Sequence, residues 1–212
     1  MKHQEIIARE GWIFIGFFAV LSGLLYYFFG MIGSLPAILL TVFSIFFFRN
    51  PPRTVPGERG MLVSPADGRV MDVVKVYEDN YLHGESVRVR IFLSIFNVHI
   101  NRIPIRCSID WVKRASGLYL PAYKDEAGTK NARNYIGFTT DWGKMLVVQV
   151  TGIVARRLVC WVEPGDVLET GERFGLIRFG SCTEIYLPPE AEIMVQEGQK
   201  VKGGETIIAR FY

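Results

Sequence analysis

The sequence is poor in the residue types that build metal sites and disulfide scaffolds. Its three cysteines, Cys107, Cys160 and Cys182, lack metal-ligand spacing, so we expect reduced thiols and neither a zinc site nor a disulfide framework. The formal net charge is only +3, and no basic stripe interleaved with aromatic residues is present. Nucleic acid is therefore not expected as a partner.

Charged residues are absent from residues 12–48. The block breaks near Gly30 into two apolar halves, 12–29 and 31–48, each 18 residues long. Each half would rise about 27 Å as a helix, close to the ~30 Å hydrocarbon core of a bilayer. Basic residues flank both ends, which is typical of an even number of spans. We predict a transmembrane helical hairpin after a cytoplasmic N-terminus, 1–11. The alternatives are a re-entrant hairpin in one leaflet and a signal peptide, whose apolar region would be shorter, about 7–15 residues.

The rest of the chain has the pattern of a β protein. From residue 61 onward, short β-branched and aromatic runs alternate with Gly, Pro and Asp, which favours antiparallel strands and few helices. The proline-rich segment 49–60 is predicted to be a stiff linker. The polar stretch 119–135 is predicted to be a loop. The sequence thus indicates a mainly β fold class, with one β domain at 61–212.

Two segments near the C-terminus repeat each other. The first repeat segment, 165–179, and the second repeat segment, 198–211, share an opening Gly, an inner Gly-Glu pair and a closing Arg-Phe. Two related hairpins that face each other predict a barrel-sandwich of the lipoyl or biotinyl carrier type. A carrier needs a modifiable lysine at a hairpin tip. Because no lysine occupies such a position, a carrier function is not expected.

Few residues are candidates for proton transfer near neutral pH. His3 precedes the apolar block, which leaves His83, in a polar turn, and His99, within FLSIFNVHINR. Taken alone, His99 is better explained as a packed, hydrogen-bonded strand residue than as a catalytic one. Asp67 lies in SPADG, a turn sequence, and Ser181 in FGSCT. A hydrolytic Ser, His, Asp set is conceivable, but the G-x-S-x-G elbow is absent.

Five segments together resemble a known family. FFFRNPPR, SPADG, FLSIFNVHINR, ARRLVCWVEPGD and FGSCTEIYLP occur in the order found in phosphatidylserine decarboxylases. The chain is similar to the short form of that family over nearly its whole length. The resemblance implies an enzyme of the cell membrane, with its catalytic domain on the cytoplasmic side. It would convert phosphatidylserine to phosphatidylethanolamine and CO2, with a covalent pyruvoyl group and without metal or pyridoxal phosphate.

The resemblance also implies that the chain is a proenzyme that cuts itself between Gly180 and Ser181. The Ser181 hydroxyl would attack the preceding carbonyl, with His99 as the base and Asp67 as its orienting partner. Ser181 would become the pyruvoyl group, which forms a Schiff base with the substrate amine. The products of the cut would be a large chain, 1–180, and a small chain, 181–212.

Four positions determine which family roles can be assigned to this chain. The long bacterial form has a second histidine three positions after the first, where this chain has Arg102, so His99 would act alone. Cys182 follows the serine and is interpreted as a neighbour without catalytic duty. Residues Arg133 and Lys130, in and beside an Asn-Ala-Arg-Asn stretch that resembles a family segment, are candidates for binding the lipid phosphate.

Two other functions stay open at this point. One is a noncatalytic barrel-sandwich module anchored to the membrane, and the other is a membrane-anchored serine hydrolase. The expected partners are a serine phospholipid, the membrane and the two chains of one precursor, and the sequence leaves a homodimer open.

Overall fold

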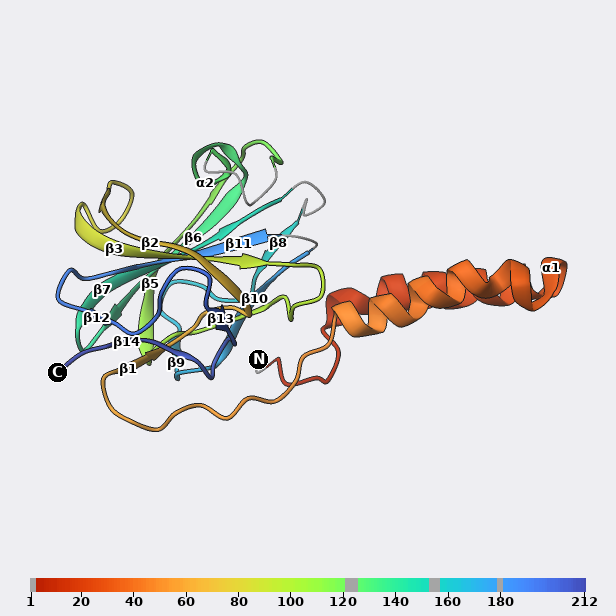
Figure 1. The fold of residues 1–212 in the computed structure, drawn as a ribbon, viewed down its shortest axis with the longest axis horizontal. Coiled ribbons are helices and arrows are strands. Elements are labelled where there is room, and N and C mark those ends of the chain that lie inside the picture. Colours follow the sequence, from red (N-terminus) through yellow and green to blue (C-terminus); the bar gives the residue numbers. More distant parts are fainter. Residues whose placement is uncertain (1–2, 121–125, 153–156, 179–180) are drawn as a thin grey trace. The chain divides into compact units, whose positions relative to one another are not determined.

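The computed structural model describes residues 3–120, 126–152, 157–178 and 181–212 (Figure 1). The chain forms two compact units, Met1–Pro52 and Arg53–Tyr212. The first is helical and the second is built from strands, so each is described separately.

The helical unit is a hairpin. A short 3-10 helix, η1 (Arg9–Gly11), leads into α1 (Trp12–Phe47). The backbone leaves the helical conformation at Gly30, where φ is 67°, a value that glycine adopts without steric cost. Beyond the two ends of α1, the Ala8 amide donates to the Phe48 carbonyl at 2.8 Å. The two halves of α1 therefore run side by side, as Figure 1 shows.

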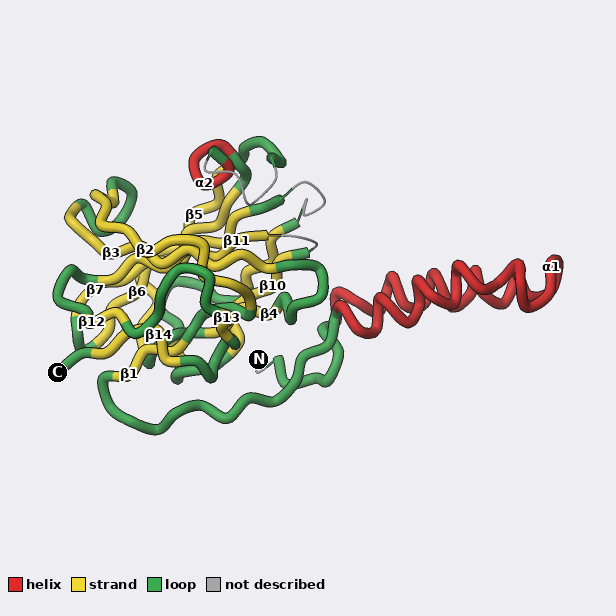
Figure 2. The backbone as a smooth tube through the Cα atoms, in the orientation of Figure 1, coloured by secondary structure: helices red, strands yellow, loops and turns green. Residues whose placement is uncertain are grey.

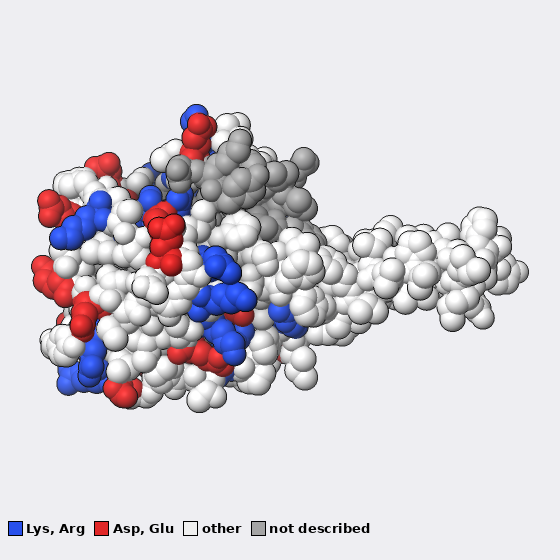
Figure 3. All heavy atoms as spheres, in the orientation of Figure 1, with Lys and Arg blue, Asp and Glu red and all other residues white. Residues whose placement is uncertain are grey.

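The outer surface of α1 is apolar. Figure 3 shows uncharged side chains over its visible face, and α1 is long and apolar enough to cross a membrane. Large hydrophobic side chains stand exposed along it, among them Tyr27, Phe28 and Ile32. An exposed apolar patch of this size is typical of a surface that contacts lipid. The helical unit therefore indicates that the chain associates with a membrane.

The second unit is almost entirely β, which confirms the predicted fold class (Figure 2). Its only described helix is the single turn α2 (Ala127–Lys130). The strands are β1 (Met61–Val63), β2 (Gly68–Glu78), β3 (Gly84–Leu93), β4 (Ile100–Arg102), β5 (Cys107–Ala115), β6 (Arg133–Thr140), β7 (Gly143–Val150), β8 (Leu158–Cys160), β9 (Val167–Leu168), β10 (Arg173–Ile177), β11 (Ser181–Leu187), β12 (Glu192–Ile193), β13 (Lys200–Val201) and β14 (Ile207–Arg210).

The described strands form one large sheet and two small ones. The large sheet has the order β13-β2-β3-β11-β7-β6-β5-β9, and the small sheets have the orders β1-β14-β12 and β4-β10-β8. All of the pairings are antiparallel. β11, which begins at Ser181, lies near the middle of the large sheet between β3 and β7.

The main core lies between one face of the large sheet and the small sheets. Side chains alternate along a strand, so β11 sends Ile185 into this core, together with Phe138 of β6 and Phe174 of β10. The opposite face carries a second apolar cluster that contains Cys182 and Val150. Consecutive residues of β11 therefore alternate between the main core and the second apolar cluster.

The two repeat segments share the same turn geometry. Gly165 and Gly198, which open them, have φ values of 97° and 82°, and the inner glycines, Gly171 and Gly204, have 81° and 79°. These left-handed conformations explain why glycine recurs at matching positions. The barrel-sandwich assignment itself stays a prediction.

One local expectation needs correction. The predicted loop at 119–135, of which 121–125 lie outside the described residues, contains α2 and the start of β6. The buried Asn131 amide donates to the carbonyls of Leu120 and Thr151. The C-terminal part of the predicted linker is packed against the β unit, where the Phe211 amide donates to the Gly60 carbonyl.

Candidate active site

Ser181 is the first residue of a central strand. It is opposite Leu93 of β3, and the next residue, Cys182, is opposite Val150 of β7. Ser181 is fully buried, and its Oγ has no hydrogen-bond partner within the described part of the chain. A buried hydroxyl without a partner is costly, so such atoms often mark a reactive or binding site. The other residue of the predicted cut, Gly180, lies outside the described residues.

The serine and the cysteine that follows it contact different layers. Thr183, two residues after Ser181, accepts a hydrogen bond from Asn101 of β4, so Ser181 shares the face that looks toward the small sheet. Cys182 packs on the other face, and burial raises the pKa of its thiol well above the usual value. A thiol held neutral in this way is a poor nucleophile, which agrees with a packing role for Cys182.

His99 is held by a tight turn at the end of β3. Its ring Nδ1 lies 3.0 Å from the carbonyl oxygen of Asn97. A carbonyl can only accept, so Nδ1 carries the proton and Nε2 is the nitrogen able to take one. The turn is itself fixed, because Asn97 accepts a hydrogen bond from the Ser94 amide through Oδ1 and donates its own amide to the Ser94 carbonyl. The imidazole is thus oriented by the backbone.

A backbone contact brings the His99 segment close to the chain that leads to Ser181. The Ile177 amide at the end of β10 donates to the His99 carbonyl at 3.1 Å. Ile177 is four residues before Ser181. The two strongest sequence candidates therefore belong to one region of the β unit.

Asp67 is tied to a different set of groups. Both carboxylate oxygens accept from the Arg53 guanidinium, at 3.0 and 2.8 Å, and Oδ1 also accepts from the Gly203 amide at 2.8 Å. The side chains of Arg53 and Asp67 are only 8% and 12% exposed. The pairing of Asp67 with His99 stays a prediction.

Arg102 lies three residues after His99. It is buried, and its guanidinium donates to the Gly171 carbonyl at 3.0 Å. Burial, with further contributions from the cations Arg173 and Arg53, lowers the pKa of Arg102 to about 10. The guanidinium is therefore still charged near neutral pH and is no substitute for a second imidazole base.

The two candidate phosphate ligands have different surroundings. Lys130 is exposed and pairs with Glu126 at 3.0 Å. Arg133 lines a cavity of about 250 Å³ together with Arg114 and Arg157. Arg133 is opposite Val150, which in turn is opposite Cys182, so its Cα lies two strand spacings, roughly 10 Å, from that of Cys182. The cavity is therefore close to the Ser181 end of the large sheet.

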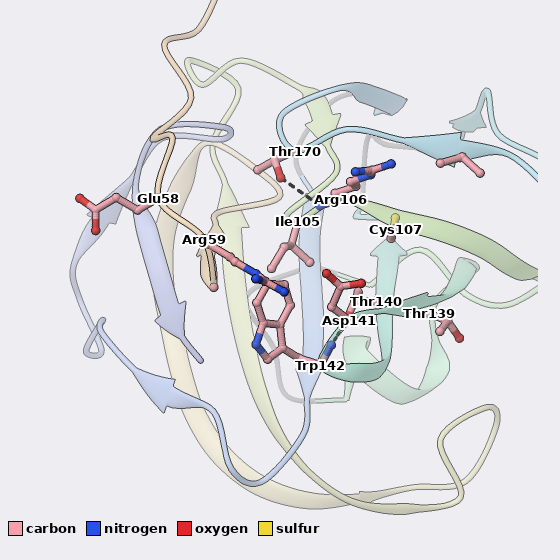
Figure 4. Close-up of a pocket in the computed structure, with 12 residues that line it drawn as sticks. Glu58, Arg59, Ile105, Arg106, Cys107, Thr139, Thr140, Asp141, Trp142 and Thr170 are labelled. Atoms are coloured by element: carbon pink, nitrogen blue, oxygen red, sulfur yellow. Dashed lines mark hydrogen bonds between the residues drawn. The ribbon is translucent and has the colours of Figure 1, made fainter. Parts of the chain in front are cut away.

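A larger cavity, of about 680 Å³, lies elsewhere (Figure 4). It is lined by Trp142 and Asp141 in the β6-β7 turn and by Arg59 and Arg106. This turn is at the other end of β7 from Val150, roughly 23 Å away along the strand. The cavity is thus separate from the serine, and its size alone assigns it no role.

His83 lies between β2 and β3, away from the candidates above. His83 occupies a turn with a φ of 50°. In the described ranges, no group of three or more His, Cys, Asp or Glu side chains is placed to hold a metal ion. This leaves Ser181 and His99 as the chemically distinctive pair.

Comparisons with known proteins identify the family of this chain. The family model described as phosphatidylserine decarboxylase matches residues 40–209. The chain belongs to this family. A relative from Carboxydothermus hydrogenoformans, named phosphatidylserine decarboxylase proenzyme, is 47% identical over 99% of each chain. Relatives with the same name from Symbiobacterium thermophilum and Syntrophus aciditrophicus are 46% and 41% identical, and the matches cover 98% and 100% of this chain and 96% and 100% of theirs. The similarity to these relatives therefore extends over nearly the full length of both chains.

The site also contains residues that sequence reasoning missed. Asn101 and Gln149 are fully buried, and the Gln149 amide donates to Asn101 Oδ1 at 2.8 Å. Asn101 lies within the FLSIFNVHINR segment, two residues after His99. The position of Asn101 two residues after His99, on the same face of a strand, could have indicated a role. Its partners, Thr183 and Gln149, could not be predicted because they come from distant strands.

Proposed function

We propose that this chain is a self-processing, pyruvoyl-dependent phosphatidylserine decarboxylase. The single observation that carries the proposal is Ser181, a buried serine without a hydrogen-bond partner in the described structure, at the start of a central strand in a member of this family. The noncatalytic module and the serine hydrolase are not favoured, because full-length relatives are named as decarboxylase proenzymes.

Maturation begins with the Ser181 hydroxyl. Its oxygen attacks the Gly180 carbonyl carbon, and the C–N bond of that peptide breaks to leave an ester and a free amine. His99 Nε2 takes the hydroxyl proton, since Nδ1 is occupied by the Asn97 carbonyl. β-Elimination then removes an α-proton and releases the large chain as a carboxylate. Water adds to the resulting dehydroalanine and ammonia leaves, which produces the pyruvoyl end of the small chain.

The residues at this position fit such a group. Ser181 is fully buried. Its Cα and Cβ would become the keto carbon and the methyl carbon of the group, while Oγ leaves in the Gly180 carboxylate and water supplies the keto oxygen. When formed, the pyruvoyl group supplies a carbonyl that binds the substrate amine and accepts the electron pair left by CO2. On this proposal, His99 Nε2 would return a proton to the substrate carbon that loses CO2. Asp67 is proposed to support this region through its contacts with Arg53 and Gly203.

The cavity beside Arg133 suits the lipid phosphate. Three guanidinium side chains, those of Arg114, Arg133 and Arg157, line it, and a guanidinium matches phosphate oxygens with two parallel donors. Lys130, which pairs with Glu126 on the surface, is the weaker candidate. The helical hairpin α1 would keep the enzyme at the membrane where its substrate resides, with the β unit on the cytoplasmic side.

The test is the fate of the chain and its activity. The wild type should appear on denaturing gels as chains 1–180 and 181–212, and the mass of the small chain should be lower than that of a serine-terminated fragment by one ammonia. Ser181→Ala should stay intact and form no phosphatidylethanolamine. Ser108→Ala, on β5, is the matched control and should be processed normally. An intact, active wild type, or labelling of uncut Ser181 by a fluorophosphonate, would contradict the proposal.

A further inference from the structure

One buried amide contacts the three segments that carry the candidate residues. Asn101 of β4 is fully buried and lies two residues after His99. Its Nδ2 donates at 3.0 Å to Oγ1 of Thr183, which is two residues after Ser181. The same Nδ2 lies 3.5 Å from the carbonyl oxygen of Pro65, two residues before Asp67. A single side chain therefore joins all three segments.

The sheets themselves do not provide this connection. β4 belongs to the β4-β10-β8 sheet, whereas β11 belongs to the large sheet, and no backbone ladder joins the two among the described strands. The Ile177 amide does bond to the His99 carbonyl, but Ile177 lies on the other side of the proposed cut from Ser181. The Asn101–Thr183 hydrogen bond ties the segment that carries His99 directly to the strand of the serine.

The orientation of the Asn101 amide is fixed by its neighbours. Its Oδ1 accepts from Gln149 Nε2 at 2.8 Å, and Gln149 Oε1 accepts from Asn134 Nδ2 at 3.1 Å. These three side chains are at most 2% exposed. Rotation of the Asn101 amide would place its Nδ2 against Gln149 Nε2, which are two donors, and its Oδ1 beside the Pro65 carbonyl, which are two acceptors. Such contacts between buried groups are costly. The Nδ2 group is therefore held toward Thr183.

We propose that Asn101 is a positioning residue for self-cleavage, which keeps the Ser181 strand in register with the His99 segment. This inference rests on the proposed function. Asn101 has no part in bond making. Its loss would let β4 and β11 shift relative to each other, and a shift of about 1 Å between reacting groups can slow a reaction roughly 100-fold.

The experiment compares two matched truncations. Asn101→Ala and Asn134→Ala each remove a buried asparagine from the same amide chain, but only Asn101 contacts the segments of the candidate residues. The full chain is synthesised in a cell-free system with lipid vesicles, and the loss of the uncut band is followed over time. We expect a cleavage half-time about 100-fold longer for Asn101→Ala. The half-time of Asn134→Ala should stay close to the wild type, because Gln149 Nε2 keeps its contacts with Asn101 Oδ1 and the Val159 carbonyl.

A second pair of variants probes the partner of the bond. Thr183→Val keeps the shape of the side chain and removes the acceptor, so it should slow cleavage as Asn101→Ala does. Thr183→Ser restores the hydroxyl and should restore the rate. The double variant Asn101→Ala/Thr183→Val should be no slower than either single variant. Thermal midpoints are measured in the uncut Ser181→Ala background and should fall for both asparagine variants. A large delay in cleavage for Asn101→Ala alone then separates positioning from stability.

The outcomes separate the two levels of the proposal. If Ser181→Ala is still cut, the proposed function fails. If Ser181→Ala is uncut but Asn101→Ala and Thr183→Val cleave at the wild-type rate, only the positioning role fails. If Asn134→Ala is slowed as much as Asn101→Ala, the amide chain acts through general stability, and the role assigned to Asn101 is overturned.

Discussion

The ion pair between Arg53 and Asp67 offers a quantitative test of what holds the SPADG segment. Replacement of Arg53 by alanine removes both guanidinium hydrogen bonds to Asp67. The Asp67 side chain, 12% exposed, then keeps the hydrogen bond from the Gly203 amide. Loss of one partner from a buried pair typically destabilises a protein by about 3–5 kcal/mol. For a unit of this size, each kcal/mol lowers the midpoint of thermal unfolding by roughly 2–4 °C. We therefore expect a decrease of roughly 6–20 °C.

The assay should use the uncut Ser181→Ala background, so that one covalent species unfolds. Arg106→Ala is the matched control, because Arg106 pairs with Glu169 at 3.4 Å while both side chains are mostly exposed, 71% and 64%. An exposed pair contributes about 0–1 kcal/mol. If Arg53→Ala lowers the midpoint no more than Arg106→Ala does, the Arg53–Asp67 pair is not a determinant of stability and the reasoning is refuted.

Three further predictions follow from single residues. Cys182→Ala should be processed like the wild type, and iodoacetamide should leave Cys182 unmodified in the native protein, because burial raises the pKa of the thiol; rapid alkylation would contradict this. Burial also raises the pKa of Glu184 above its unfolded value, so the folded state binds more protons and loses stability as pH rises above about 4.5. Glu184→Gln, which can still accept from the Tyr186 hydroxyl, should gain thermal stability over the wild type with rising pH; a constant difference between pH 4 and 8 would refute this. Gly171→Ala should lower the melting temperature, because φ is 81° there and a Cβ would lie 2.4 Å from Val55 Cγ2, whereas Gly165→Ala, also at positive φ but in open space, should lower it less.

The strands could be predicted from local pattern, but their order could not. β-branched runs predicted β3 and β7 because the alternation of side chains is written in each segment. The position of β11 between them depends on pairing over long sequence separations, which no local pattern encodes. The prediction that 119–135 is a loop was wrong for a related reason. The polar Asn131 looks solvent-facing in sequence, yet its amide is buried and donates to the carbonyls of Leu120, in the same segment, and Thr151, twenty residues later.

The candidate site, like the fold, could be predicted only where the information is local in the sequence. His99 and Ser181 could be proposed from motifs, since residue type and order carry that information. The atoms that orient them could not, because the Asn97 carbonyl is backbone and the Asn101–Thr183 contact joins two sheets. Residues that position a site through contacts between layers have no signature in a single sequence, even when, as with Asn101, they lie inside the motif.

The topology also explains how an enzyme cut beside a central strand would stay assembled. On the proposed reading, the small chain supplies β11, β12, β13 and β14. β11 has neighbours from the large chain on both sides, β3 and β7, while β13 pairs with β2 and β14 with β1. Leaving the large chain would break all of these ladders at once and expose Ile185 and Ile208 from the main core. Separation of the two chains is therefore equivalent to unfolding the β unit, so the new chain end at Ser181 is free to change chemically while the strand that carries it stays in place.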